Sequence, residues 1–179
     1  MASEGTHSMV DRMIRASCLD VHIFEEVEAD TSATRQAFSV VVLVALATGI
    51  ASLGTTGLGG LFVGVVVAIA GWAIWAWIVY LIGTKIIPSH ATHADWGQLA
   101  RTLGFAQSPG IFRVLGAVPV VGLIIFLVVS IWMLVAMVIA VRQALDYTST
   151  WRAIAVVWLG FIPYLLLMST AYTLLEAYG

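Results

Sequence analysis

Long apolar runs separated by short polar segments occupy the chain from residue 37 onward. The first run, Ala37–Leu53, has 17 residues, close to the roughly 20 that a helix needs to cross a hydrocarbon core of about 30 Å. The uncharged turn Gly54–Gly57 follows, and a second run extends over Leu58–Ile82. A tight turn without charge predicts that the second helix returns directly. The pattern therefore predicts a membrane hairpin.

A second apolar stretch, residues 111–146, is too long for one straight crossing. Gly116 and Pro119 predict a break in it. We therefore expect a short interfacial or half-inserted elbow helix over 111–118, and a third span over 119–144.

Residues 151–175 form the last apolar run and predict a fourth span. A fifth full span over 111–128 is the alternative, but residues 129–132 contain no turn signal to end it. We expect an all-α membrane protein: a four-span helical bundle with an amphipathic N-terminal region and a short interfacial elbow helix before the third span.

Residues 1–35 mix apolar and charged positions and predict an amphipathic region. Apolar side chains recur there at helical spacing: Val10, Ile14, Cys18, Val21 and Phe24. Asp20 is placed to cap a second short helix. The polar face turns acidic toward Asp30, whereas lipid-surface helices are usually basic. We expect this region to dock on the protein's own membrane domain, with lipid-surface or partner binding as the alternative.

Composition supports the membrane interpretation, because 61% of residues are hydrophobic and 10% are charged. Soluble domains average roughly 25% charged residues. The net charge of −2 provides no basic field for nucleic acid. The first 35 residues lack the apolar core of a cleavable signal peptide, so the first long run is expected to act as the insertion signal. Cys18 is the single cysteine and is expected to be a buried, inert residue.

The distribution of Lys and Arg predicts the orientation, because cytoplasmic loops are richer in both. With four spans, six of the eight basic residues share the side of the two termini, and Arg142 and Arg152 lie on the other. We expect a multi-pass protein of the cell's inner (plasma) membrane, with both termini cytoplasmic.

Arg142, Asp146 and Arg152 flank the turn between the last two spans. We interpret them as a polar staple that closes this hairpin at the outer membrane edge, and a substrate gate is the alternative. Every charged residue is expected in a loop, at an interface or in the last turn of a span. The polar candidates at depth are Thr48, Ser130, Ser169 and Thr170. This pattern argues against an ion-coupled transporter, although a passive pore formed between subunits remains an alternative.

Gly60 and Gly64 have the GxxxG spacing that lets helices approach closely in lipid, and Gly71 follows on the same run. We expect them to mediate helix packing within the subunit, with a contact between subunits as the alternative.

His90, His93 and Asp95 form a weak candidate for a metal site, since structural zinc normally takes four protein ligands. We interpret them as a solvated polar loop and expect no cofactor. No nucleophile stands beside a plausible base, so no catalytic site is expected.

Five short segments resemble prokaryotic members of the Yip-domain family: Phe24–Val27, Thr34–Ala37, Arg101–Pro109, Val141–Leu145 and Trp151–Ala155. The resemblance extends over roughly residues 9–176. It implies a cytoplasmic N-terminal region over 1–35 and a Yip-like membrane domain over 36–176.

Eukaryotic members of that family work in membrane trafficking and associate with small GTPases of the Rab/Ypt type. Their Asp-Leu-Tyr-Gly-Pro signature is absent here, so the GTPase partner is not carried over. The resemblance implies that Gly104, Phe105 and Pro109 belong to a family motif, and it supplies no catalytic residue.

The expected function is a non-enzymatic one, in which the protein organises or accompanies membrane proteins or lipids. The expected partners are membrane lipids and either another membrane protein or further copies of this chain, with no nucleic acid. The alternatives are a transporter or channel subunit whose pathway forms by oligomerisation, and an accessory subunit of a larger membrane complex.

Overall fold

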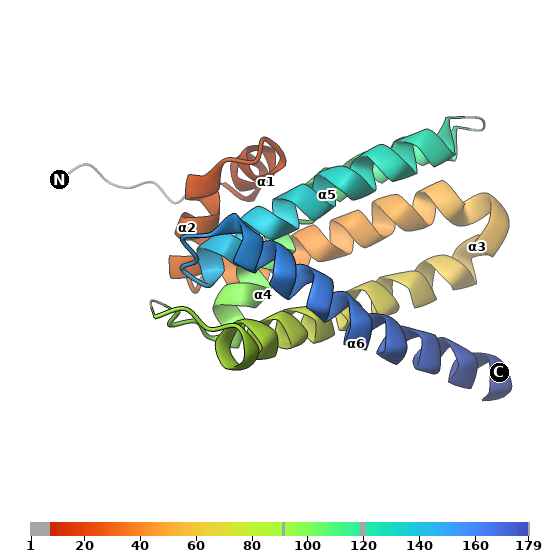
Figure 1. Cartoon of the computed structure of the whole chain (residues 1–179). Helices are drawn as coiled ribbons and strands as arrows, with labels where there is room; N and C mark the ends of the chain where they lie inside the picture. Colours follow the sequence, from red (N-terminus) through yellow and green to blue (C-terminus); the bar gives the residue numbers. More distant parts are fainter. Residues whose placement is uncertain (1–7, 91, 119–120, 179) are drawn as a thin grey trace.

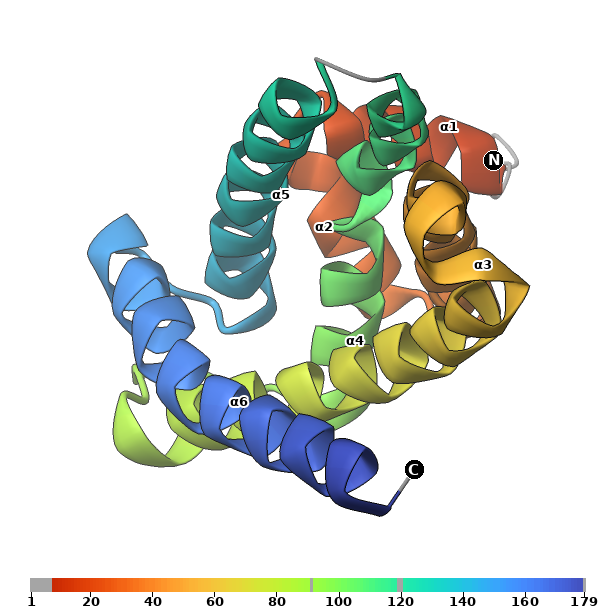
Figure 2. The same cartoon turned by 90° about the vertical axis from the view of Figure 1, so that its right-hand side faces the viewer.

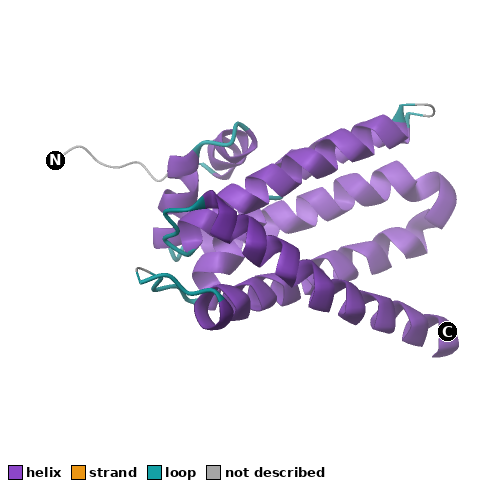
Figure 3. Ribbon diagram, in the orientation of Figure 1, coloured by secondary structure: helices purple, strands orange, loops and turns teal. Residues whose placement is uncertain are grey.

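The computed structural model describes the backbone of residues 8–90, 92–118 and 121–178, and this part of the chain is helical without any strand (Figures 1 and 3). The elements, in chain order, are α1 (Met9–Ser17), α2 (Val21–Ala29), α3 (Ala33–Leu81), the π-helical turn η1 (Ile82–Ile86), α4 (Trp96–Phe105), the 3₁₀ helix η2 (Ser108–Ala117), α5 (Gly122–Ala144) and α6 (Thr150–Tyr178).

Three helices in the described residues are long and apolar enough to cross a membrane, whereas the sequence pattern predicted four. They extend over Ala33–Ile86, Gly122–Ala144 and Thr150–Thr170. The difference arises at the expected turn Gly54–Gly57, where helical hydrogen bonding continues and Gly57 alone leaves helical geometry, with φ 64° and ψ −172°. The first two predicted spans are therefore two arms of one bent helix, which we call arm 1 (33–56) and arm 2 (58–86).

The helices form a bundle with one polar end and one apolar end, which we call the far end. Figure 1 shows α1, α2 and α4 at the polar end, together with the turn between α5 and α6. The bend of α3 lies at the far end. Arm 2 and α6 run antiparallel, since Gly160 faces Trp75 and the later Tyr164 faces the earlier Gly71.

The direction of the last helices differs from the prediction. η2 leaves the polar end and stands between arm 1 and α5, as the view along the bundle shows (Figure 2). α5 then returns to the polar end, where Gln143 Nε2 donates to Glu25 Oε1 at 2.7 Å. α6 consequently runs away from the polar end and ends at the far end. The expected arrangement had both ends of the chain on one side.

The N-terminal helices pack on the bundle, as the sequence predicted. Asp20 caps α2 by accepting from His22 N, and Ile23, Phe24 and Val27 are fully buried. The predicted apolar face of α1 is wrong, however, because Val10 and Ile14 are exposed while Arg12 and Ala16 point inward. The ion pairs of Arg12 explain this rotation. Cys18 is exposed, contrary to the expectation that it is buried.

Candidate functional site

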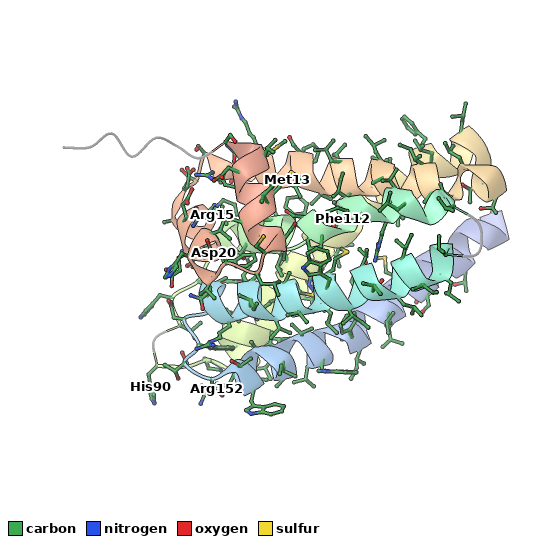
Figure 4. The ribbon with its side chains drawn as sticks, turned by 90° about the horizontal axis from the view of Figure 1, so that it is seen from above. Met13, Arg15, Asp20, His90, Phe112 and Arg152 are labelled. Carbon is green, nitrogen blue, oxygen red and sulfur yellow. The ribbon has the colours of Figure 1, made fainter. Side chains whose placement is uncertain are left out.

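The charged side chains gather at the polar end of the bundle. Figure 4 places Arg15, Asp20, His90 and Arg152 there, although they come from four different segments of the chain. Of the eight Lys and Arg residues, Arg113 alone lies along the apolar part of the bundle, and the other seven belong to the elements of the polar end. The polar end is therefore the first candidate site.

A salt-bridge network holds α1 and α2 at this end. Arg12 Nη2 lies 2.9 Å from Glu26 Oε1 and 2.8 Å from Asp30 Oδ2, and Arg12 Nη1 donates to Gln36 Oε1 at 3.0 Å. Hydrogen bonds from Ser32 and then from Arg12 lower the pKa of Asp30. The network joins α1, α2 and the start of α3.

Arg101 joins α4 to the end of α2. Its Nε and Nη2 donate to the carbonyl oxygens of Val27 and Glu28, at 3.0 and 2.5 Å. The last carbonyls of a helix have no partner inside the helix, so a buried guanidinium beside them satisfies both groups. Arg101 thereby holds the end of α2, which includes Glu28, against α4.

A cavity of about 570 Å³ opens where α2, α4 and the end of α5 meet. Its polar lining consists of Glu25, Glu28, Gln98, Arg142, Gln143, Asp146, Tyr147 and Thr148. The pKa of Glu28 is raised from 4.5 to about 7, first because burial penalises the charged carboxylate and then because Asp146 adds negative charge nearby. The cavity carries more acidic than basic groups, which suits a cationic group of a partner.

The guanidinium of Arg142 is occupied within the turn that follows α5. It donates to Tyr147 O at 3.2 Å and to Thr150 Oγ1 at 3.1 Å. Arg152 Nη1 donates to Pro88 O at 3.2 Å, and Asp146 lines the cavity. Arg142 therefore bonds within the α5–α6 turn, whereas Arg152 reaches the segment that follows η1. Arg142 and Asp146 share the cavity with Glu25 and Glu28 of α2, so they lie at the polar end and not at the opposite end of the bundle.

The histidine loop does not assemble a metal site among the described residues, where no group of three metal-ligating side chains gathers. His90 and His93 are exposed. The carboxylate of Asp95 caps α4 by accepting from Gln98 N at 2.9 Å, and the Gln98 side chain accepts from Asp95 N in return.

The three glycines of arm 2 have different surroundings. A Cβ on Gly71 would lie 2.8 Å from Tyr164 Oη of α6, so arm 2 and the Tyr164 side chain approach closely at this position. A Cβ on Gly60 would clash with Thr56 across the bend, and a Cβ on Gly64 would meet nothing within 4 Å. Gly60 and Gly64 instead line a cavity between the two arms.

The family-like motif is a packing site between α4 and α3. A Cβ on Gly104 would lie 2.8 Å from Ala37 Cβ and 3.2 Å from Ala37 O. Phe105 is fully buried, and Pro109 is buried at the start of η2. The motif lets α4 cross arm 1 at close range and then directs the chain into η2.

Arg113 on η2 was missed as a site, because the sequence interpretation put every charge in a loop, at an interface or in the last turn of a span. Its Nη2 donates to Ser130 Oγ at 3.0 Å, and Ser130 lies well inside α5. A guanidinium so placed is exceptional in an apolar bundle. Thr48 and Ser130, which the sequence did identify as polar groups at depth, both lie beside it.

Of three comparisons with known proteins, one finds a match. Neither the curated proteins nor the solved structures contain a significant match to the chain. The model of the Yip1-domain family, in contrast, matches residues 21–170, from the first residue of α2 into α6. Since this match covers most of the 179 residues, the chain belongs to the Yip1-domain family of membrane proteins.

Proposed function

We propose that this protein organises or accompanies other membrane proteins without catalysing a reaction, and that its polar end is the docking surface for a protein partner. The observation that carries the proposal is the separation of charge. Seven of the eight basic residues belong to the elements of the polar end, where an acidic cavity also opens, while the rest of the bundle presents mainly apolar side chains to lipid. Yip1-family membership supports a membrane-associated role.

We further propose a topology of four long crossings, formed by arm 1, arm 2, α5 and α6. The short η2 helix follows α4 and leads to the start of α5, so it carries the chain from the polar end to the far end. Its ten residues extend only about 20 Å at the 3₁₀ rise, which is less than a hydrocarbon core. The excess of Lys and Arg at the polar end supports a cytoplasmic position for it. In this topology α1 and α2 are cytoplasmic and α6 ends on the other side.

Site-specific photo-cross-linking in cells tests the docking role. A photoreactive residue at His93, exposed at the polar end, is expected to give a discrete protein adduct, and one at Leu123, exposed near the far end, is not. Glu25→Arg, which reverses a charge of the cavity, should remove the adduct. Thr34→Arg, exposed but outside the cavity, should leave it unchanged. Adducts at Leu123 alone would place the partner on the apolar surface and overturn the proposal.

A transporter or channel subunit is the competing function, and the hydroxyl groups beside Arg113 are the observation in its favour. Purified protein in liposomes separates the two functions. Proton or cation flux above that of empty vesicles, lost in Thr48→Val and Ser130→Ala, would establish a pore. We expect no such flux.

A further inference from the structure

Arg113 carries a positive charge inside the apolar part of the bundle, and no carboxylate in the described part of the chain neutralises it. No salt bridge joins it to any other described residue, and its Nε is buried without a hydrogen-bond partner among them. Among the described residues, the guanidinium donates a hydrogen bond to Ser130 and lies over the ring of Phe126, whose centroid is 4.9 Å from Arg113 Cζ. Ionisable groups at this depth usually pair with an opposite charge or line a functional site. Since no described carboxylate neutralises it, the guanidinium is open to an anionic partner from outside the chain.

Two cavities meet at this guanidinium. One, of about 210 Å³, lies between the two arms of α3 and reaches from Gln107 to Thr56 and Gly60 at the bend. The other, of about 230 Å³, lies between arm 1 and the start of α5, and Phe126 forms part of its wall. Thr48, Ser52 and Arg113 line both cavities. Space for a ligand is thus present on either side of the charge.

A line of hydroxyl groups leads from Arg113 to the far end. Thr48, Ser52 and Thr56 follow one another at intervals of four residues on arm 1, so they stack on one face of the helix. Each donates to a backbone carbonyl of the preceding turn, as Thr48 Oγ1 does to Val44 O at 2.9 Å. Thr56 stands beside Gly57, about 12 Å along the helix from Thr48. A polar headgroup entering from the far end meets this line before it reaches the guanidinium.

We propose that Arg113 binds the anionic headgroup of a phospholipid from the leaflet at the far end, and that Thr48, Ser52 and Thr56 line the polar path that leads to it. The guanidinium supplies charge-assisted hydrogen bonds to the phosphate. The walls formed by Val44, Ala45, Gly64 and Ala68 accept the apolar part of the molecule. A lipid fits better than a free ion, because a small anion would have to leave water for a largely apolar cavity.

Thermal unfolding of the full-length protein in an uncharged detergent tests the site. A ligand that binds only the folded protein raises Tm with its concentration. Phosphatidylglycerol is expected to raise Tm in a saturable way, whereas phosphatidylcholine and inorganic phosphate at equal concentration are not. An equal rise in Tm with phosphatidylcholine would show that the lipid's negative charge is not recognised. An equal rise with inorganic phosphate would show that the site binds a free anion and does not require a lipid. Either result overturns the proposal.

Two pairs of variants assign the effect to the site. Arg113→Gln should weaken the apparent affinity for phosphatidylglycerol on the order of tenfold or more. Arg152→Gln, which removes an exposed charge at the polar end, should leave it unchanged. A full response in Arg113→Gln, or an equal loss in both variants, contradicts the site.

Ser52→Leu keeps the guanidinium and fills the cavity, so it should also abolish the lipid response. Its control, Ser39→Leu, removes a similar back-bonded serine on the same helix outside the cavity, and should respond as the native protein does. This pair decides the question if Arg113→Gln does not fold, and a lipid response retained in Ser52→Leu overturns the proposal.

Discussion

Arg12 joins three elements through one side chain that is 2% exposed. Its carboxylate partners, Glu26 and Asp30, follow it by 14 and 18 residues, and Gln36 follows by 24. The sequence pattern places Arg12 on the polar face of α1, and nothing in that pattern identifies these partners. The position of α1 is therefore determined by contacts that helical periodicity does not encode.

Replacing Arg12 by Met should destabilise the protein, because Asp30 loses its counter-charge and Glu26, which keeps its pair with Arg15, loses the pair with Arg12. We expect a loss of roughly 3 kcal/mol, the low end for breaking a buried pair, since Glu26 and Asp30 keep about a quarter of their exposure. Thermal unfolding in detergent measures the effect. Arg35→Met is the matched control, because Arg35 is exposed at the start of α3. Equal Tm values for the two variants would show that the network does not stabilise the fold.

Glu28 should make stability depend on pH near neutrality. Its pKa in the folded protein is about 7 against an ordinary value of 4.5, so between these values the folded state binds more protons than the unfolded state. Stability is then greatest below about pH 4.5 for this group and falls as pH rises to about 7. Tm measured from pH 5 to 8 should fall less in Glu28→Gln than in the native protein. Parallel curves would contradict the assignment.

At the scale of the elements, Gly57 allows α3 to reverse its direction within one residue. Its φ of 64° lies in the region where the backbone of residues other than glycine is strained, although a Cβ there would meet nothing within 4 Å. Backbone strain is therefore the only expected penalty, of about 1–3 kcal/mol, in Gly57→Ala. The control is Gly59→Ala, which also has open space but lies in regular helix, and there alanine should be neutral or stabilising. Thermal unfolding compares the two, and equal effects would argue against strain at the bend.

The crossing of α4 over arm 1 depends on the absence of a side chain at position 104. Gly104→Ala would bring a methyl group to 2.8 Å from Ala37 Cβ, against backbone that moves little. Overpacking of this kind costs about 1–3 kcal/mol. The double variant Gly104→Ala with Ala37→Gly should recover part of the loss in Tm, because it removes the opposing methyl group. No recovery would show that the clash lies elsewhere.

The sequence predicts the helices better than their directions. The apolar runs gave positions for both arms of α3, for α5 and for α6, and Asp20 was correctly identified as a helix cap. The bend was expected as a turn, because glycine content does not distinguish a loop from a helix interrupted at one residue. The path of η2 could not be predicted, since a segment of ten residues is short enough to lie at the membrane surface as well as along the bundle. Because residues 111–118 were expected at the membrane surface, Arg113 was expected there as well. For the same reason, Arg142 and Arg152 were expected at the end of the bundle opposite α2.

For the molecule as a whole, the position of the chain ends follows from the path of η2. The chain passes five times between the polar end and the far end, in arm 1, arm 2, η2, α5 and α6. Because five is an odd number, α6 ends opposite α1 (Figure 1). The polar end contains seven of the eight basic residues. Basic residues are retained on the cytoplasmic side during insertion. We therefore expect the polar end to face the cytoplasm and the far end to face outward.

Cysteine labelling in a Cys18→Ser background tests this topology, since Cys18 is exposed and would react. Single cysteines are introduced at Ser8, His90 and Thr148 on the polar end, and at Thr55 and Thr173 toward the far end, all of them exposed. A membrane-impermeant maleimide applied to intact cells should label positions 55 and 173. Positions 8, 90 and 148 should react only after the membrane is opened. Val66→Cys, exposed midway along arm 2, should stay unlabelled because lipid covers it. The opposite result would be labelling of positions 55 and 148 in intact cells while positions 8 and 173 stay protected. It would mean that the chain crosses the membrane an even number of times and that η2 does not traverse the bundle in the cell.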